Sequence, residues 1–335
     1  MCVLQLPHLA SLTGLVIALV LSGCSNAPMD GMAAHAEMSG PDNTVDAYRT
    51  VSNSGKLGPQ ENRIHPGPVN LPPTLGTDTT KDAKGILLAP TLNIEVLTME
   101  DLEGIDARNV TIKDICGPPD WIRVDPTHVP ERFVVSLRIH KKGSTTVFSG
   151  TGALIGPRCI LTVGHNVYCT TAGSIEGWAG SIDVYAGRSG AHCFARTTSS
   201  NFRSISGWVD GNKEMNDYDI AAIILPDDEL YKWAQGHFGV APIGSNDTVQ
   251  LLGYPWEKKI TSMKGHQLRS YGPTTVKDKI LTYRMDSYPG HSGSPVFTSD
   301  EDLHIVGVHA GGSCPNESIR INEALMERIK EWTEL

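Results

Sequence analysis

Three short motifs place a histidine, an aspartate and a serine where they could activate a nucleophile. Residues 161–166 run from an apolar stretch into a small-residue turn that contains His165. Asp219 opens a second apolar stretch, and Ser292 lies in a glycine-rich turn within residues 289–297. A serine hydroxyl attacks efficiently only when an imidazole accepts its proton and a buried carboxylate holds that imidazole in one tautomer. These motifs therefore predict covalent hydrolysis, with Ser292 as nucleophile, His165 as base and Asp219 as its partner.

The turn around Ser292 also predicts a site for a developing negative charge. Glycines let the backbone turn sharply, so that N–H groups can point at an oxyanion. We expect the amides of Gly290 and Ser292 to be the donors. Ser294 is a rival nucleophile, but it follows the oxyanion turn, so we favour Ser292. Asp217 is a rival acid, but Asp219 directly precedes the apolar stretch, so we favour Asp219.

The sequence pattern predicts that short strands position these residues. Apolar runs separated by Gly, Pro, Asn and Asp turns are typical of an all-β sandwich or barrel. Glycine (34) and proline (21) are both plentiful, which suits strands joined by turns. The candidate strands are residues 133–139, 151–155, 159–162, 182–185, 220–225, 249–254, 280–284, 295–297 and 304–309.

The C-terminal tail is the exception to the strand pattern. Asn322 is a suitable N-cap, and apolar residues recur behind it at helical spacing. The sequence therefore predicts a C-terminal helix whose buried face consists of Leu325, Met326, Ile329 and Trp332.

Composition describes an ordinary globular protein and excludes some functions. The chain has 335 residues, of which 40% are hydrophobic and 19% charged. Its formal net charge of −9 argues against nucleic-acid binding, which needs a basic face. Its twelve histidines show no His-Glu-x-x-His spacing, and no paired Cys-x-x-Cys motif is present, so we expect no metal. The predicted hydrolysis needs no cofactor.

The N-terminal residues predict export. The apolar run over residues 9–23 is too short to span a bilayer and suits a signal-peptide core. It ends in Leu21-Ser22-Gly23-Cys24, which resembles the lipobox of bacterial lipoproteins, although no Lys or Arg precedes Cys24. That resemblance implies lipidation of Cys24 and a membrane anchor when at least two acyl chains are attached. Residues 1–24 are thus assigned as a leader.

The next stretch differs in composition from the rest of the chain. Residues 25–91 are rich in Gly, Pro, Met, Asn and Thr with little periodicity, whereas residues 92–97 could pair as a strand of a small pro-domain. We expect residues 25–120 to form a largely irregular pro-segment or linker and residues 121–335 the catalytic domain.

Seven cysteines are compatible with one or two disulfides in an exported protein. Cys159 and Cys169 flank His165 and could close a short loop around it. A bridge to Cys193 is the alternative, since connectivity cannot be read from sequence.

From about Trp121 to Leu335 the chain resembles the trypsin-like serine proteases, specifically the bacterial glutamyl endopeptidases. The resemblance implies two packed six-stranded antiparallel β-barrels of the chymotrypsin-like kind, with the triad between them, and a precursor cut between Leu92 and Ile122. A lipidated pro-segment would then tether the precursor, and processing would release the enzyme. The matching motifs are Gly152–Pro157, Gly164–Tyr168, Tyr218–Ala221, Gly253–Pro255, Met285–Phe297 and Gly307–His309.

The same resemblance implies a preference for Glu, then Asp, at the P1 position of the substrate. In that family a histidine on the strand after the serine binds the P1 carboxylate, helped by a Thr or Ser; the matching residues are His309 and Ser287. A carboxylate that enters a partly buried pocket must regain hydrogen bonds, and a histidine can donate one. His291, beside the nucleophile, is expected to be an exposed turn residue.

Three interpretations remain open at this point. The first is a glutamyl endopeptidase that acts as a monomer on peptide and protein substrates. The second is a trypsin-like protease with another P1 preference, in which His309 is an ordinary core histidine. The third is a catalytically silent surface lipoprotein that only binds partners.

Overall fold

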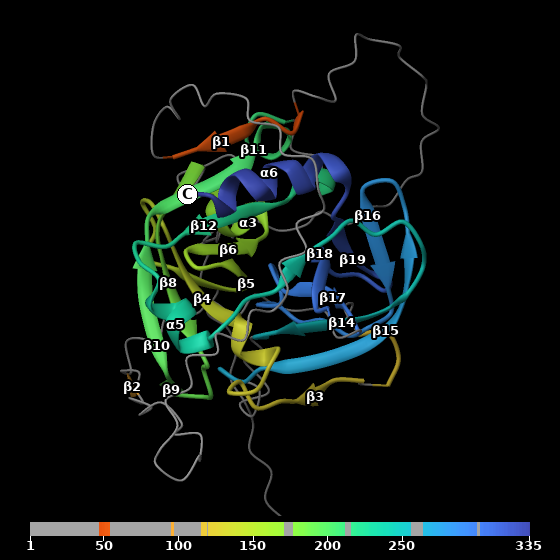
Figure 1. Ribbon diagram of the computed structural model, residues 1–335, viewed down its shortest axis with the longest axis horizontal. Coiled ribbons are helices and arrows are strands. Elements are labelled where there is room, and N and C mark those ends of the chain that lie inside the picture. Colours follow the sequence, from red (N-terminus) through yellow and green to blue (C-terminus); the bar gives the residue numbers. More distant parts are fainter. Residues whose placement is uncertain are drawn as a thin grey trace, which may run out of the picture.

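The computed structural model describes residues 47–53, 95–96, 115–118, 120–170, 177–211, 216–255, 264–299 and 302–335. Two mainly antiparallel β-sheets pack against each other, with helices at their margins (Figure 1). This architecture confirms the expected all-β, chymotrypsin-like fold with a C-terminal helix. The expected leader, including Cys24, lies outside the described residues.

The first sheet is an open half-barrel. Its strands follow the order β1, β11, β12, β6, β5, β4, β8 and β10, and β7 adds to β8. Among the described strands no pairing joins its two ends. The bounds are β1 (Thr50–Ser52), β4 (Val134–Lys141), β5 (Val147–Gly156), β6 (Cys159–Thr162), β7 (Tyr168–Cys169), β8 (Gly177–Ala186), β10 (Ala195–Ser199), β11 (Asn201–Ile205) and β12 (Ala221–Ile224).

The second sheet closes into a six-stranded barrel. The order β18, β17, β14, β15, β16 and β19 returns to β18 through antiparallel pairs. Two short strands join it, β13 in parallel to β18 and β3 to β15. The bounds are β3 (Ile122–Arg123), β13 (Gly239–Val240), β14 (Thr248–Gly253), β15 (Leu268–Val276), β16 (Ile280–Tyr283), β17 (Pro295–Thr298), β18 (His304–Gly311) and β19 (Asn316–Arg320).

Short helices connect these strands, and the longest ends the chain. They are α3 (Gly164–Val167), α4 (Ser206–Val209), α5 (Glu229–Ala234) and α6 (Glu323–Thr333). The predicted cap of α6 is confirmed, because Asn322 Oδ1 accepts a hydrogen bond from the Leu325 amide at 2.9 Å. Its predicted apolar face is also confirmed, with Leu325, Met326, Ile329 and Trp332 buried.

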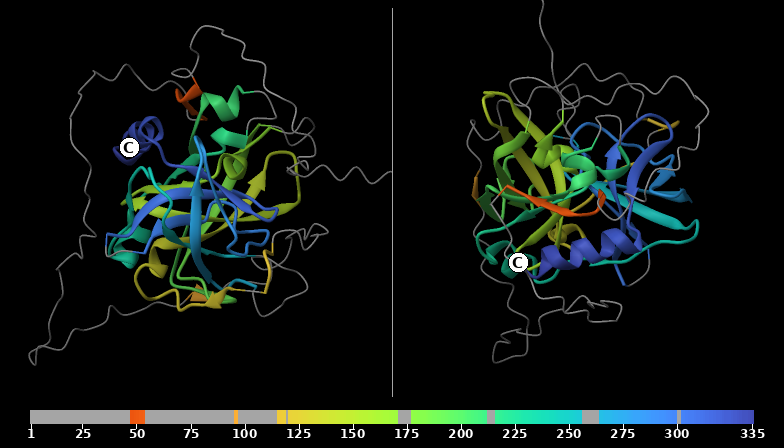
Figure 2. Two further views of the ribbon diagram at one scale, coloured as in Figure 1. Left: turned by 90° about the vertical axis from the view of Figure 1, so that its right-hand side faces the viewer. Right: turned by 90° about the horizontal axis from the view of Figure 1, so that it is seen from above.

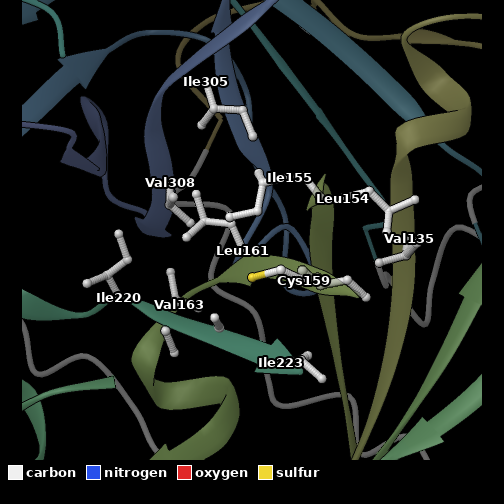
Figure 3. Packing of buried hydrophobic residues seen from close by; sticks show 14 of the residues in the cluster. Val135, Leu154, Ile155, Cys159, Leu161, Val163, Ile220, Ile223, Ile305 and Val308 are labelled. Atoms are coloured by element: carbon white, nitrogen blue, oxygen red, sulfur yellow. The ribbon is translucent and has the colours of Figure 1, made fainter. Parts of the chain in front are cut away.

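One large apolar core joins the two sheets. Val135, Leu154 and Leu161 of the first sheet and Ile305 and Val308 of the second belong to the same buried cluster (Figure 3). Burial of about 25 cal/mol per Å² of apolar surface is the main stabilising term for such a fold. The shared core therefore fixes the two sheets relative to each other, together with the loops between them.

Two short strands come from the stretch expected to be largely irregular. β1 pairs with β11, and β2 (Glu95–Val96) pairs with β9 (His192–Cys193). The strand expected over residues 92–97 is thus present at its centre, paired with the catalytic region.

The expected Cys159–Cys169 bridge is wrong. Cys159 carries a reduced, buried thiol, whose pKa burial raises to about 12. Cys169 is disulfide-bonded, but Cys193 is reduced as well and is not its partner. A disulfide that the sequence did not predict links Cys116 to Cys314, with the Cα atoms 5.3 Å apart. Cys159 lies on β6 within the apolar core, so its thiol serves as a small hydrophobic group.

Candidate active site

His165 and Asp219 form a tightly coupled pair between strands of the first sheet. His165 Nδ1 lies 2.6 Å from Asp219 Oδ2, and the backbone amide of His165 donates to Asp219 Oδ1 at 2.7 Å. Two bonds to one carboxylate fix both the position of the residue and the orientation of its ring. The side chain of Asp219 is 5% exposed and that of His165 is 21% exposed, so the imidazole edge is open to a substrate. Asp217, by contrast, is half exposed and lies 3.9 Å from Lys279.

The elements of the first sheet explain this geometry. β6 ends at Thr162, and the single helical turn α3 begins at Gly164. Gly164 is needed here because a Cβ would lie 2.6 Å from the ring of Trp208. Lys141 of β4 donates to the His165 carbonyl at 2.8 Å, at the C-terminal end of this turn, where a cation is favourable.

Ser292 lies in a turn that is bonded to the same region. Its carbonyl accepts from the Thr151 amide at 2.9 Å and from Asn166 Nδ2 at 3.1 Å. Because Asn166 is the neighbour of His165, one side chain ties the nucleophile turn to the histidine turn. Gly293 has φ +92°, and a Cβ on it would lie 2.0 Å from the Thr151 carbonyl oxygen, so only glycine fits.

The turn also presents two amides suited to an oxyanion. Gly290 has φ +94°, and its carbonyl is held by the Thr151 hydroxyl at 2.7 Å. Within the described residues, the amides of Gly290 and Ser292 donate to no acceptor, whereas those of His291, Gly293 and Ser294 do. Two amides in one turn that have no acceptor are what a developing oxyanion requires.

His309 lies directly behind this turn on β18. Its carbonyl accepts from the Gly293 amide at 2.8 Å, and its amide donates to the Ser294 carbonyl at 2.9 Å. Its side chain is 3% exposed. Burial, and secondarily the proximity of His165, lowers the pKa of His309 to about 3, so the ring is neutral at neutral pH.

The Tyr283 hydroxyl contacts the Nδ1 nitrogen of His309. The Tyr283 hydroxyl lies 2.6 Å from His309 Nδ1 and 3.5 Å from the Glu317 carbonyl. We assign the hydroxyl proton to the shorter contact, which makes Nδ1 the acceptor and leaves the proton on Nε2. His309 therefore offers an N–H donor.

The expectation that His291 is an exposed turn residue is wrong. The residue is 2% exposed, and its ring packs edge-on against His309 with centroids 6.3 Å apart. Its Nδ1 accepts from the Tyr288 amide at 3.2 Å, and burial lowers its pKa to about 3. A polar residue beside a nucleophile gives no sequence signal of burial, since only the tertiary structure places it beneath the turn.

Ser287 is buried and points to β19. Its hydroxyl donates to Asn316 Oδ1 at 3.1 Å, and Asn316 Nδ2 donates to the Met285 carbonyl at 2.7 Å. Tyr283 is the strand partner of Asn316, so Ser287 and His309 are connected through β16 and β19. Asn316 and Tyr283 were not singled out from the sequence, because neither belongs to a recognisable motif.

Residues just before the expected start of the catalytic domain brace this region. The amides of Cys116 and Asp120 donate to the two oxygens of Asp286 at 2.9 and 3.1 Å. Asp286 is 1% exposed, and burial raises its pKa despite these bonds. Trp121 Nε1 donates to the Tyr288 hydroxyl at 3.2 Å. The segment between β16 and β17 that carries Ser287 is therefore held by Cys116, Asp120 and Trp121.

The described residues contain no group of three or more His, Cys, Asp or Glu side chains arranged to hold a metal ion. None of their helices is both long and apolar enough to cross a membrane.

The packed sheets and the His165–Asp219 pair beside a glycine-rich serine turn define a trypsin-like peptidase. In agreement, the model of the trypsin-like peptidase domain family matches residues 150–308. A glutamyl endopeptidase of Bacillus licheniformis is 33% identical over 239 residues, covering 66% of this chain and 70% of that protein. A protein named extracellular metalloprotease, of Bacillus subtilis, is 28% identical over 297 residues, covering 84% of this chain and 86% of that protein.

A solved structure supports the same assignment. A Glu endopeptidase determined in complex with MPD aligns with a TM-score of 0.57 and 26% identity, over 66% of this chain and all of that one. The chain belongs to the glutamyl endopeptidase branch of the trypsin-like serine proteases, as the sequence motifs predicted, and it is a serine endopeptidase.

Proposed function

We propose that this endopeptidase cleaves after Glu, and more slowly after Asp, through Ser292, His165 and Asp219. The observation that carries the proposal is the doubly bonded His165–Asp219 pair next to the turn of Ser292. A buried carboxylate on Nδ1 leaves Nε2 as the proton acceptor for the serine. No other described pair offers this combination at a serine turn.

The proposed chemistry proceeds by acyl transfer. Ser292 Oγ attacks the scissile carbonyl carbon while its proton passes to His165 Nε2, and the amides of Gly290 and Ser292 stabilise the oxyanion. The imidazolium then protonates the departing amine, which breaks the C–N bond and leaves an ester on Ser292. Water, deprotonated by His165, attacks this ester and restores the free serine. Asp219 stays ionised and stabilises the imidazolium throughout.

His309 supports the acidic preference. It offers an Nε2 donor, its backbone bonds to Gly293 and Ser294, the two residues after Ser292, and it is buried beside His165. A substrate carboxylate in this position would accept that hydrogen bond and would favour the charged imidazolium. Ser287 supplies a hydroxyl from the segment between β16 and β17, which donates to Asn316 in this structure.

The contacts of Cys116, Asp120 and Trp121 are relevant to where the precursor is cut. We propose that the mature enzyme begins before Cys116, because the bridge to Cys314 and the bonds to Asp286 make this stretch part of the catalytic domain. A cut just before Cys116 would leave a new amino terminus near Asp286, the residue before Ser287. Export through residues 1–24 and lipidation of Cys24 remain part of the proposal, as does the monomeric state.

The test is hydrolysis of peptides that differ only at P1, by processed wild-type protein and by Ser292→Ala. We expect rapid cleavage after Glu and a variant that retains only about a thousand- to ten-thousandfold acceleration over water. Cleavage after another residue would remove the role given to His309. Failure of folded, processed protein to cleave any peptide would favour the silent binding protein instead.

A further inference from the structure

The open edge of the first sheet is covered by a strand from the N-terminal region. β1 pairs antiparallel with β11, with Val51 opposite Ser204, and the Ser206 amide donates to the Arg49 carbonyl at 2.8 Å. Figures 1 and 2 show β1 lying along β11 at the margin of the sheet. An uncovered edge strand exposes a row of amides and carbonyls that readily pair with another chain. Residues 50–52 satisfy that edge from within the molecule.

Asn53 extends this pairing beyond the strand. Its Nδ2 donates to the Ser200 carbonyl at 2.6 Å, and its Oδ1 accepts from the Phe202 amide at 2.8 Å. The side-chain amide thus bonds to Phe202 of β11 and to Ser200 just before it, as a further peptide unit would. A paired donor and acceptor of this kind requires one register, so the strand is specified rather than incidental.

Side chains attach the same segment to the C-terminal helix. Asn322, which caps α6, also donates through Nδ2 to the Tyr48 hydroxyl at 3.1 Å. Trp332 Nε1, at the other end of α6, donates to Thr50 Oγ1 at 3.1 Å. The Tyr48 ring packs edge-on against Tyr218 with centroids 5.5 Å apart, and Tyr218 directly precedes Asp219. The segment is therefore held by β11 on one side and α6 on the other.

We propose that β11 and α6 form a strand-docking site whose occupant is residues 47–53, and that this strand stays docked after the chain between residues 54 and 114 is cut. The mature enzyme is then a two-chain particle, with a short N-terminal piece supporting the turn that carries Asp219. Only the two-chain state of the mature enzyme rests on the proposed processing. The docking itself rests on the contacts of residues 47–53.

The test uses the full chain with an engineered cut, which makes it independent of natural processing. Ser292→Ala prevents self-cleavage, Cys2→Ser and Cys24→Ser exclude a covalent link, and a recognition sequence for a site-specific protease replaces residues 66–72. After cutting, gel filtration and intact mass should find the N-terminal fragment with the catalytic part. Separation of the wild-type fragment during gel filtration would overturn the proposal.

Matched variants then test the contacts. Tyr48→Ala combined with Asn53→Ala should weaken retention at least about tenfold, because it removes three side-chain hydrogen bonds and a ring contact. Arg49→Ala, whose side chain pairs with an exposed Asp210, should change retention less than about twofold. Equal retention by the double variant and wild type would count against docking at this site.

Amide exchange shows where the fragment lies. In the cut protein with residues 47–53 unchanged, the amides of Phe202 and Ser206 should stay protected, since Asn53 and Arg49 are their acceptors. The double variant should exchange the Phe202 amide at least about tenfold faster. A retained fragment with an unprotected Phe202 amide would contradict the proposed site.

Discussion

Removing the Tyr283 hydroxyl should weaken recognition of an acidic P1 residue without affecting the nucleophile. The hydroxyl lies 2.6 Å from His309 Nδ1, and both side chains are buried. In Tyr283→Phe, His309 loses the bond that keeps its proton on Nε2, so part of the population presents an acceptor to the substrate carboxylate. The loss of one net hydrogen bond is about 1 to 1.5 kcal/mol.

This energy corresponds to a roughly 5- to 13-fold fall in kcat/KM for peptides with Glu at P1. The assay compares these peptides with a small neutral ester that acylates Ser292 without filling the P1 pocket, for which we expect less than a twofold change. Tyr271→Phe is the matched control, since Tyr271 lies on the neighbouring β15 and is 62% exposed; it should leave both substrates unaffected.

Two results would refute the reasoning. An equal fall for the peptide and the ester would show that Tyr283 acts on the nucleophile rather than on His309. Unchanged hydrolysis of both would show that His309 does not depend on Tyr283 for its tautomer.

Three further substitutions test other parts of the site. Asp219→Asn should lower kcat about ten-thousandfold with KM little changed, measured on the same Glu peptide, because the amide favours the wrong tautomer of the histidine; a loss under a hundredfold would contradict the role of Asp219. Gly293→Ala should lower the free energy of unfolding, measured with urea, by at least about 3 kcal/mol, since a Cβ would lie 2.0 Å from the Thr151 carbonyl oxygen. Gly244→Ala is the control; Gly244 has open space around it, so the free energy of unfolding should hardly change. The lowered pKa of His291 means that its contribution to stability is present above about pH 6.5 and is lost as the pH falls toward 3, because the unfolded state takes up the proton first. His291→Asn, which keeps an acceptor for the Tyr288 amide, should reduce the slope of unfolding free energy between pH 6 and 4 by about 1.4 kcal/mol per pH unit, and an unchanged slope would show that His291 is not buried neutral.

Elements with a strong apolar pattern were predictable from the sequence. β6 matches its predicted bounds, and α6 begins at the predicted cap, because continuous apolar runs and a capping Asn are local signals. β10 and β19 were missed: their sequences, ARTTS and NESIR, are mostly polar, and their pairing depends on the neighbouring strands. β11 was missed for the same reason, although four of its five residues are buried.

The residues of the candidate site also differ in whether a local sequence pattern predicts them. Residues within recognisable motifs, such as His165, Asp219 and Ser292, could be proposed from the sequence, whereas the side chains that contact and orient them could not. Tyr283 and Asn166 act through contacts between segments far apart in sequence, and nothing local indicates those contacts. The Cys159–Cys169 prediction failed because proximity in sequence to His165 says nothing about burial, and β6 directs Cys159 into the core.

The two backbone bonds between His309 and the two residues that follow Ser292 constrain how this enzyme could acquire a new specificity. The residue proposed to bind the substrate side chain and the proposed nucleophile are joined through adjacent main chain, by way of Gly293 and Ser294. An insertion or deletion in β18 would therefore displace the nucleophile along with the pocket. Exchange of the side chain at position 309, with its backbone unaltered, is the route along which substrate preference could diverge during evolution or in directed selection while catalysis is preserved.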